Sequence, residues 1–95
     1  MMTEVVISGK FKRAFRKFVR RNQLLQIRVE QAIEDLAHDI YHPSLGTHKL
    51  EGKLSGLLSC SCGYDCRIVF AIEKDDRSGE IAIVSLDVGT HDEIY

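Results

Sequence analysis

Two helical patterns follow each other in the first half of the chain, and this pair constrains the fold more than any other feature. Apolar residues recur at helical spacing from Phe11 to Val19, with Lys and Arg between them, and again from Leu25 to Ile40. Only a short break around Asn22 separates the two patterns. Because helices joined by so short a link pack against each other, we expect an antiparallel helical hairpin.

The ends of both helices carry recognisable signals. Ser8 offers a hydroxyl that caps the start of the first helix, and Asn22 offers a side-chain oxygen for the second. Pro43 forces the residue before it out of helical geometry. We therefore expect the second helix to end near Tyr41 or His42.

Runs rich in β-branched residues flank the helical half. We expect a first strand at residues 4–8, a loop over 42–56, and strands at 57–61, 66–73 and 81–88 joined by turns that contain glycine. Three strands in this order favour an antiparallel meander. The prediction is an α+β fold, with an N-terminal strand and the helical hairpin packed on one face of the sheet. The length of 95 residues fits one domain, residues 1–95.

Alternation assigns the two faces of the central strand. One face, which we expect to meet the helices, carries three large apolar residues, and the other carries Arg67. The apolar set is Ile68, Phe70 and Ile72, and the opposite set is Arg67, Val69 and Ala71. An arginine buried without a partner would be costly, so Arg67 is expected to face an open groove.

Charge is distributed unevenly along the chain. Residues 1–30 hold eight Lys and Arg against two acids, a net of +6, whereas residues 73–95 hold two bases against seven acids, a net of −5. The basic segment suits an anionic partner. The alternative is that these charges form two solvated faces that attract each other.

Two polar segments stand out as candidate sites. The predicted loop contains Thr47-His48-Lys49-Leu50-Glu51-Gly52-Lys53, and the chain ends in Gly89-Thr90-His91-Asp92-Glu93-Ile94-Tyr95. Chain ends usually fray unless something ties them down. A tail with a histidine and a tyrosine this close to a strand is therefore either docked or functional, against the alternative of a solvated acidic tail.

Three cysteines, Cys60, Cys62 and Cys66, are an odd and crowded number, which favours reduced thiols over a disulfide framework. We expect buried thiols, with Cys66 the most exposed. A zinc site is the weaker alternative, because a fourth ligand is not adjacent. No apolar run reaches the roughly 20 residues that span a bilayer, and no signal-peptide core is present, so we expect a cytoplasmic protein with no membrane contact.

Taken in order, these segments resemble the RelE/ParE superfamily of bacterial type II toxins. The resemblance lies in the basic hairpin, the loop with Lys49-Leu50-Glu51-Gly52, the run Tyr64-Asp65-Cys66-Arg67-Ile68-Val69-Phe70 and the terminal Gly89-Thr90-His91. It spans nearly the whole chain, and it is nearest to the YafQ-like branch of messenger-RNA endonucleases. The resemblance implies a RelE/ParE-like fold, ribosome-dependent cleavage of mRNA, no cofactor or metal, and neutralisation by a cognate antitoxin.

Site residues follow from the same resemblance. His91 matches the C-terminal catalytic histidine of the family, Tyr95 its closing aromatic residue, and His48 the loop histidine of the YafQ-like branch. Asp65 matches the acid in the turn before the central strand, and Arg67 resembles the phosphate-binding arginine.

Two positions depart from the family pattern. Ser61 stands where YafQ-like toxins have a further histidine, and Asp87 where they have an arginine. One acid-base group and one cation are therefore missing. If Ser61 faces the groove as the resemblance suggests, Cys60 and Cys62 alternate onto the core face.

Metal-independent cleavage of RNA needs a group that accepts a proton, one that donates a proton, and cations that offset the added negative charge. Histidine suits both proton transfers, so His91 is the first candidate for general acid or base and His48 its partner. Asp65 would orient a histidine or restrain Arg67, whose guanidinium would hold the scissile phosphate.

The remaining candidates contact RNA away from the scissile bond. Lys49 and Lys53 are candidate clamps on the RNA backbone, and Tyr95 a candidate base-stacking residue.

Each of these roles has a structural alternative. His48 is then an ordinary loop residue, His91 bonds the sheet edge, Arg67 pairs with Asp65 or Asp87, and Tyr95 is a packing anchor. At the level of the whole protein, the alternatives are a ParE-like inhibitor that binds DNA gyrase and a degenerate toxin that only binds its antitoxin.

Overall fold

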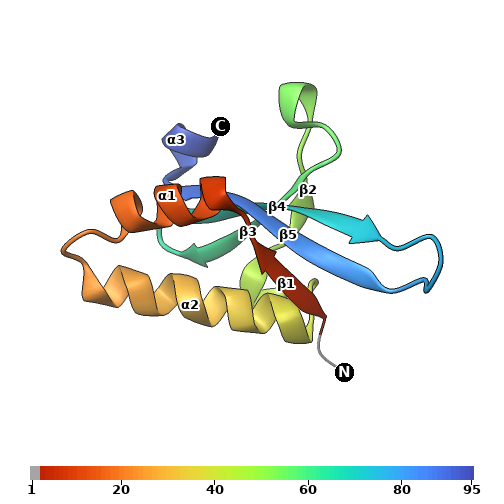
Figure 1. Ribbon diagram of the computed structural model, residues 1–95. Helices are drawn as coiled ribbons and strands as arrows, with labels where there is room; N and C mark the ends of the chain where they lie inside the picture. Colours follow the sequence, from red (N-terminus) through yellow and green to blue (C-terminus); the bar gives the residue numbers. More distant parts are fainter. Residues whose placement is uncertain (1–2) are drawn as a thin grey trace.

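The computed structural model describes residues 3–95 and shows a five-stranded mixed sheet in the order β1-β5-β4-β3-β2 (Figure 1). Two helices precede most of the sheet in the chain, and a third, very short helix ends it. The elements are β1 (Glu4–Ile7), α1 (Gly9–Phe18), α2 (Gln23–His38), β2 (His48–Lys49), β3 (Leu58–Gly63), β4 (Cys66–Lys74), β5 (Ile81–Gly89) and α3 (His91–Ile94), with short 3₁₀ turns at Pro43–Leu45 and Gly52–Leu54.

Both predicted helix caps are confirmed. The Ser8 Oγ accepts a hydrogen bond from the backbone N–H of Phe11 at 3.0 Å, and the Asn22 Oδ1 accepts one from Leu25 at 3.0 Å. Each bond satisfies a backbone donor that has no partner inside the helix. The two helices run antiparallel, as their short connection requires (Figure 1).

The predicted end of α2 was wrong by about one turn. The helix ends at His38, because Asp39 adopts an extended conformation with φ −157° and ψ 103°. Its carboxylate then accepts a hydrogen bond from the N–H of Tyr41 at 3.1 Å. Asp competes with helical hydrogen bonding in this way, so the helix stops before Pro43 can act.

The core lies between the helical hairpin and one face of the sheet. Phe11, Val29 and Leu36 from the helices meet strand residues that are fully buried, among them Cys60, Ile68, Phe70 and Ile83. Full burial of a large apolar side chain contributes about 1.5–3 kcal/mol. The predicted core face of β4 is therefore confirmed for Ile68 and Phe70, while Ile72 is partly buried.

The sheet is larger than the predicted meander and is not purely antiparallel. Strands β3, β4 and β5 form the antiparallel meander, but β1 pairs with β5 in parallel, with Val5 opposite Ile83. The predicted loop at 42–56 also contains β2, which adds antiparallel to β3 with His48 opposite Ser59. Backbone pairing at a sheet edge, rather than residue composition, makes this two-residue segment a strand.

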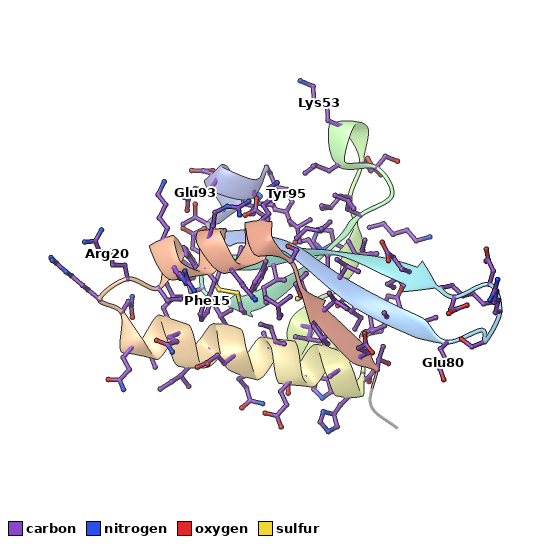
Figure 2. The ribbon with its side chains drawn as sticks, viewed as in Figure 1. Phe15, Arg20, Lys53, Glu80, Glu93 and Tyr95 are labelled. Carbon is purple, nitrogen blue, oxygen red and sulfur yellow. A yellow bond between two sulfur atoms is a disulfide. The ribbon has the colours of Figure 1, made fainter. Side chains whose placement is uncertain are left out.

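The basic and the acidic segment are far apart at one place and adjacent at another, where Lys17 of α1 and Glu93 of α3 line the same groove. Figure 2 shows Arg20 at the α1–α2 connection and Glu80 at the far β4–β5 hairpin. Within residues 3–95, the only ion pair between a Lys or Arg and an acidic side chain joins Lys10 Nζ to Asp87 Oδ2 at 3.9 Å. The interpretation of two solvated faces that attract each other stays a prediction, because this pair joins the basic and the acidic segment at one point. None of the helices in the described part of the chain is long and apolar enough to cross a membrane.

The expectation of three reduced cysteines was wrong. Cys62 and Cys66 form a disulfide across the β3–β4 turn, and Cys60 is the free, buried thiol. Their Cα atoms are 5.0 Å apart, inside the range of roughly 4.4–6.8 Å that disulfides use. Cys66 is also fully buried rather than exposed. The tight hairpin turn brings the two thiols together, and cysteine counting could not show this.

Candidate functional site

Strand register places the predicted residues on the outer face of the sheet, the face that turns away from the helical hairpin. His48 lies opposite Ser59, which lies opposite Val69; in the next row Ser61 lies opposite Arg67. Arg67 in turn lies opposite Gly89, two residues before His91. Neighbouring strands are about 4.8 Å apart. The register therefore brings the loop histidine, the strand arginine and the C-terminal segment to one end of this face.

Asp65 holds the start of α3. Its carboxylate Oδ1 accepts a hydrogen bond from the backbone N–H of His91 at 2.9 Å. Asp65 occupies the left-handed region with φ 50°, which Asp and Asn tolerate better than most residues. Asp65 therefore contacts His91 through the backbone and not through the imidazole, and its role in orienting a histidine stays a prediction.

The last residues form a capped helix and not a solvated tail. The Thr90 Oγ1 accepts a hydrogen bond from the N–H of Glu93, and the Glu93 carboxylate accepts one from the N–H of Thr90 at 3.0 Å. These two bonds form a capping box. The Thr90 hydrogen bonds lower the pKa of the Glu93 carboxyl from its ordinary value. The C-terminus is therefore ordered by its own side chains.

Tyr95 docks α3 onto the sheet. Its hydroxyl donates a hydrogen bond of 2.5 Å to the Oγ of Ser59, which is fully buried. Its ring meets the imidazole of His91 edge to face at 4.6 Å between centroids, and lies 6.4 Å from that of His48. Tyr95 therefore acts as a packing anchor, which the sequence analysis gave as the alternative to base stacking. The residue is still 46% exposed.

Both histidines reach solvent. The His48 Nδ1 lies 3.1 Å from the carbonyl oxygen of Gly46, which leaves Nε2 as the free ring nitrogen, and the residue is exposed. The His91 side chain is 61% exposed, and its Nδ1 is 3.6 Å from the carboxylate of Asp92. The His48 ring is therefore held at Nδ1, and both rings are open to solvent.

Arg67 is held by the β3–β4 turn. Its Nη1 donates to the carbonyl oxygens of Cys66 at 2.8 Å and Gly63 at 3.2 Å, and contacts the Ser61 Oγ at 3.4 Å. Within residues 3–95, all of its hydrogen bonds use Nη1, so Nη2 and Nε remain for an anion. No ion pair between Arg67 and Asp65 or Asp87 is present in this part of the chain, which removes that alternative.

The two departures from the family pattern occupy different places. Ser61 lies beside Arg67 on the outer face, and its hydroxyl is bound to the backbone of Gly63. Asp87 accepts a hydrogen bond from the N–H of Val88 and pairs with Lys10 of α1. Neither position supplies a proton-transfer group near neutral pH or a cation.

The two candidate RNA clamps lie outside this cluster. Lys49 follows His48 in β2 and lies opposite Leu58, so alternation directs it to the other face of the sheet. Lys53 stands at the outer tip of the loop between β2 and β3 (Figure 2). The sequence grouped these lysines with His48, but the structure separates them from it.

Basic α1 borders the other side of α3. A surface groove between α1 and the end of β5 is lined by Ala14, Lys17, Thr90, Glu93 and neighbouring residues. Lys17 also contributes to lowering the pKa of Glu93. The positive helix predicted from the charge pattern therefore lies next to the C-terminal helix that carries His91.

Two contributors to the site were missed. Ser59 gave no signal, because a serine inside a strand is unremarkable until Tyr95 is placed above it. Thr90 did give one, since Thr90-x-x-Glu93 is the capping-box pattern and predicts a helix start. For metals, residues 3–95 contain no cluster of three or more His, Cys, Asp or Glu side chains placed to hold an ion.

No family model and no curated protein sequence matches the chain. Solved structures do match. A YoeB/ParE toxin from Agrobacterium tumefaciens superposes with a TM-score of 0.74 at 12% identity, over 94% of this chain and 99% of that one. YafQ from E. coli gives 0.69 at 10% identity over 98% of each chain.

The RelBE2 toxin-antitoxin complex from Mycobacterium tuberculosis gives a TM-score of 0.67 at 23% identity, over 96% of this chain and 100% of that one. All three similarities extend over nearly the whole length of both chains. The chain therefore has the α+β fold of the RelE/ParE superfamily toxins, as the sequence resemblance implied. The resemblance to the YafQ-like branch stays a prediction.

Proposed function

We propose that this protein is the toxin of a type II toxin-antitoxin pair and that it cuts messenger RNA at the ribosome without a metal. The observation that carries the proposal is that the rings of His48 and His91 flank the ring of Tyr95, with Asp65 bonded to the His91 backbone. Arg67 lies on the neighbouring strand, opposite Gly89, which is two residues before His91. On this proposal residues 1–95 are one toxin domain acting in the cytoplasm, where its substrate is translated.

The chemistry uses the ribose 2′-hydroxyl as nucleophile on the adjacent phosphate. One histidine accepts the proton of that hydroxyl and the other protonates the leaving oxygen, each transfer contributing about 10²–10⁴-fold. His91 and His48 supply these groups, since both have a ring side open to solvent. Arg67 holds the phosphate through Nη2 and Nε while Nη1 stays bound to the turn.

The other residues support binding. Asp65 positions His91 through the backbone, and Tyr95 fixes α3 through Ser59 while its exposed ring edge remains for a nucleobase. Lys49 and Lys53, which lie outside the cluster, contact RNA or ribosomal RNA backbone farther from the scissile bond. Their exposure suits the salt-dependent contacts that lysine makes with phosphate.

The test is induction of the wild type, His91→Ala and His48→Ala in a bacterial host, with mRNA 5′ ends mapped over the first minutes. New ends in phase with codons are expected for the wild type and absent for His91→Ala. His38→Ala is the matched control, because His38 lies on α2 with its Nδ1 near the Glu34 carbonyl, away from the site. Equal cleavage by His91→Ala and the wild type would remove the catalytic assignment.

A second candidate is inhibition of DNA gyrase by binding. It is favoured by Ser61, whose hydroxyl is occupied by Gly63 and Arg67 where a third proton-transfer group would stand in a YafQ-like toxin. Growth arrest with intact messages, together with inhibition of supercoiling by purified toxin, would support this function. Absence of any growth arrest would instead point to a degenerate toxin that only binds its antitoxin.

The proposed partner is a small antitoxin protein. This proposal is supported by the fold shared with the RelBE2 complex, which contains a toxin and its antitoxin. Co-expression of the product of an adjacent small gene is expected to restore growth and to co-purify with the toxin. A neighbouring gene product that does neither would argue against this pairing.

A further inference from the structure

The Cys62–Cys66 disulfide closes the turn on which two of the site residues depend. The two cysteines are four positions apart in sequence, Cys62 near the end of β3 and Cys66 at the start of β4. Between the cysteines lie Gly63, Tyr64 and Asp65. The covalent loop therefore encloses Asp65 and ends directly before Arg67.

Contacts within this loop position both residues. Arg67 donates through Nη1 to the carbonyl oxygens of Gly63 and Cys66, one inside the loop and one at its end. Asp65 holds the N–H of His91 from within the loop. A change in the path of the loop backbone thus moves the arginine and breaks one of the two side-chain bonds that hold α3 on the sheet, the other being that of Tyr95 with Ser59.

The disulfide is the covalent anchor of this turn, which hydrogen bonds of Ser61 and Arg67 with Gly63 also hold. Tyr64 is 96% exposed and packs on nothing that would fix the turn. Asp65 has a φ of 50°, which costs free energy for a residue that carries a Cβ, whereas Gly63 adopts its φ of 140° freely. The sulfur atoms of Cys62 and Cys66, by contrast, lie in the apolar core. The disulfide therefore anchors an otherwise exposed turn to the core.

We propose that Cys62–Cys66 is a thiol–disulfide exchange site, and that its reduction by a dithiol releases Asp65 and Arg67 and so lowers the activity of the toxin. A thiolate of the reductant attacks one sulfur of the bridge, the S–S bond breaks, and a mixed disulfide forms with one cysteine. The second thiol of the reductant resolves it. Two electrons and two protons pass to Cys62 and Cys66, and the reductant becomes a disulfide; an oxidised dithiol reverses the reaction.

Exchange requires the turn to open, because Cys62 is 6% and Cys66 0% exposed. Only a few residues at a hairpin tip need to move, and such local openings occur far more often than global unfolding. The third cysteine does not take part. Cys60 is fully buried, and burial raises its pKa to about 12, which keeps it a protonated thiol and a poor nucleophile. The reductant therefore comes from outside the chain.

The first experiment counts thiols. In a Cys60→Ala variant, the purified protein is treated with dithiothreitol under native conditions, quenched with acid, and labelled with a maleimide in denaturant. No maleimide label is expected before treatment, and two labels per chain are expected after it. The rate of disulfide reduction is expected to stay the same when low concentrations of denaturant are added. Reduction only at the rate of global unfolding would overturn the proposal.

The second experiment reads the site without RNA. Hydrogen exchange of the His91 amide is compared between oxidised and reduced protein, with Cys62→Ala/Cys66→Ala as the permanently open form. Reduction is expected to speed exchange at least about tenfold, as loss of one hydrogen bond implies, and to leave the double variant unchanged. Equal protection in the oxidised and reduced wild type would contradict the proposal.

The expected loss of activity on reduction rests on the proposed endonuclease function. Separate measurements test the exchange site and the endonuclease. Messenger RNA cleavage on ribosomes is expected to fall on reduction for the wild type and for Cys60→Ala, but not for the double alanine variant. Faster exchange at His91 in a protein that cuts no RNA would support the exchange site and contradict the endonuclease. Undiminished cleavage by the reduced wild type would contradict the regulatory role.

Discussion

The carboxylate of Asp65 accepts the backbone N–H of His91 at 2.9 Å, a bond between residues 26 positions apart in sequence. It joins the β3–β4 turn to the first residue of α3. The imidazole of His91 is thereby placed by its own backbone, while its ring stays exposed. An exposed histidine of the candidate site is thus positioned by a turn whose two flanking cysteines lie in the core.

Replacement of Asp65 by alanine is expected to release α3. The change removes the acceptor and places alanine at φ 50°, so we expect a loss of about 1–2 kcal/mol in the free energy of unfolding and about tenfold in cleavage. Asp65→Asn is the matched control, because asparagine keeps an acceptor oxygen and tolerates this φ. Urea denaturation and ribosome cleavage assays measure both effects, and an Asp65→Ala variant as stable and active as the wild type would refute the role.

Replacement of Tyr95 by phenylalanine separates anchoring from base stacking. The variant loses the hydroxyl bond to the buried Ser59 but keeps the ring beside His91, so stability is expected to fall by about 0.5–1.5 kcal/mol. Ser59→Ala removes the other partner, and the double variant is expected to cost less than the sum of the singles. Additive costs would mean that the two hydroxyls do not act as a pair.

Replacement of Arg67 by lysine is expected to weaken catalysis more than folding. A lysine ammonium cannot bind the Gly63 and Cys66 carbonyls and a phosphate at once through a planar fork. We expect kcat/KM to fall on the order of ten- to a hundredfold, with a small change in melting temperature. Arg77→Lys, in the exposed β4–β5 turn, is the control, and an equal effect at both positions would argue against a specific role for Arg67.

The capping box of α3 is expected to weaken in acid. The hydrogen bonds from Thr90 lower the pKa of Glu93, so its contribution is fully present above its ordinary pKa of 4.5. That contribution is lost as the pH falls through the lower value in the folded protein. The protection of the Thr90 amide, taken as its exchange rate relative to that of an unstructured peptide at the same pH, should therefore fall below pH 4.5, and Glu93→Gln should lack this pH dependence. A wild-type profile that matches Glu93→Gln would contradict the prediction.

The buried thiol of Cys60 is expected to make the fold sensitive to high pH. Burial raises its pKa from 9.0 to about 12, so the unfolded chain releases this proton at a lower pH than the folded protein does. Stability is therefore full below pH 9 and falls as the pH rises toward 12. At a pH of about 10.5 the loss should be about 2 kcal/mol relative to Cys60→Ala, measured by urea denaturation. Parallel pH profiles of the two proteins would be the contrary result.

Local patterns predicted much of the scaffold correctly. The side chains of Ser8 and Asn22 lie within three residues of the donors they cap, and period-two alternation placed Arg67 on the face opposite Ile68 and Phe70. The predictions were wrong where a competing hydrogen bond or a partner distant in sequence decides the local structure. Asp39 ended α2 early through its own carboxylate, and His48 became part of a strand because the edge of β3 was available.

The amino-acid sequence by itself determined the helical hairpin, the three-stranded meander and the resemblance that singled out His48, Asp65, Arg67, His91 and Tyr95, because these depend on spacing and residue type along the chain. Tertiary structure alone decided how they meet: the parallel pairing of β1 with β5, the bridge between Cys62 and Cys66, and the bonds that tie α3 to Asp65 and Ser59. These contacts join residues that are far apart in sequence and become neighbours only when the chain folds. The spacing of residues along the chain does not show which distant residues become neighbours.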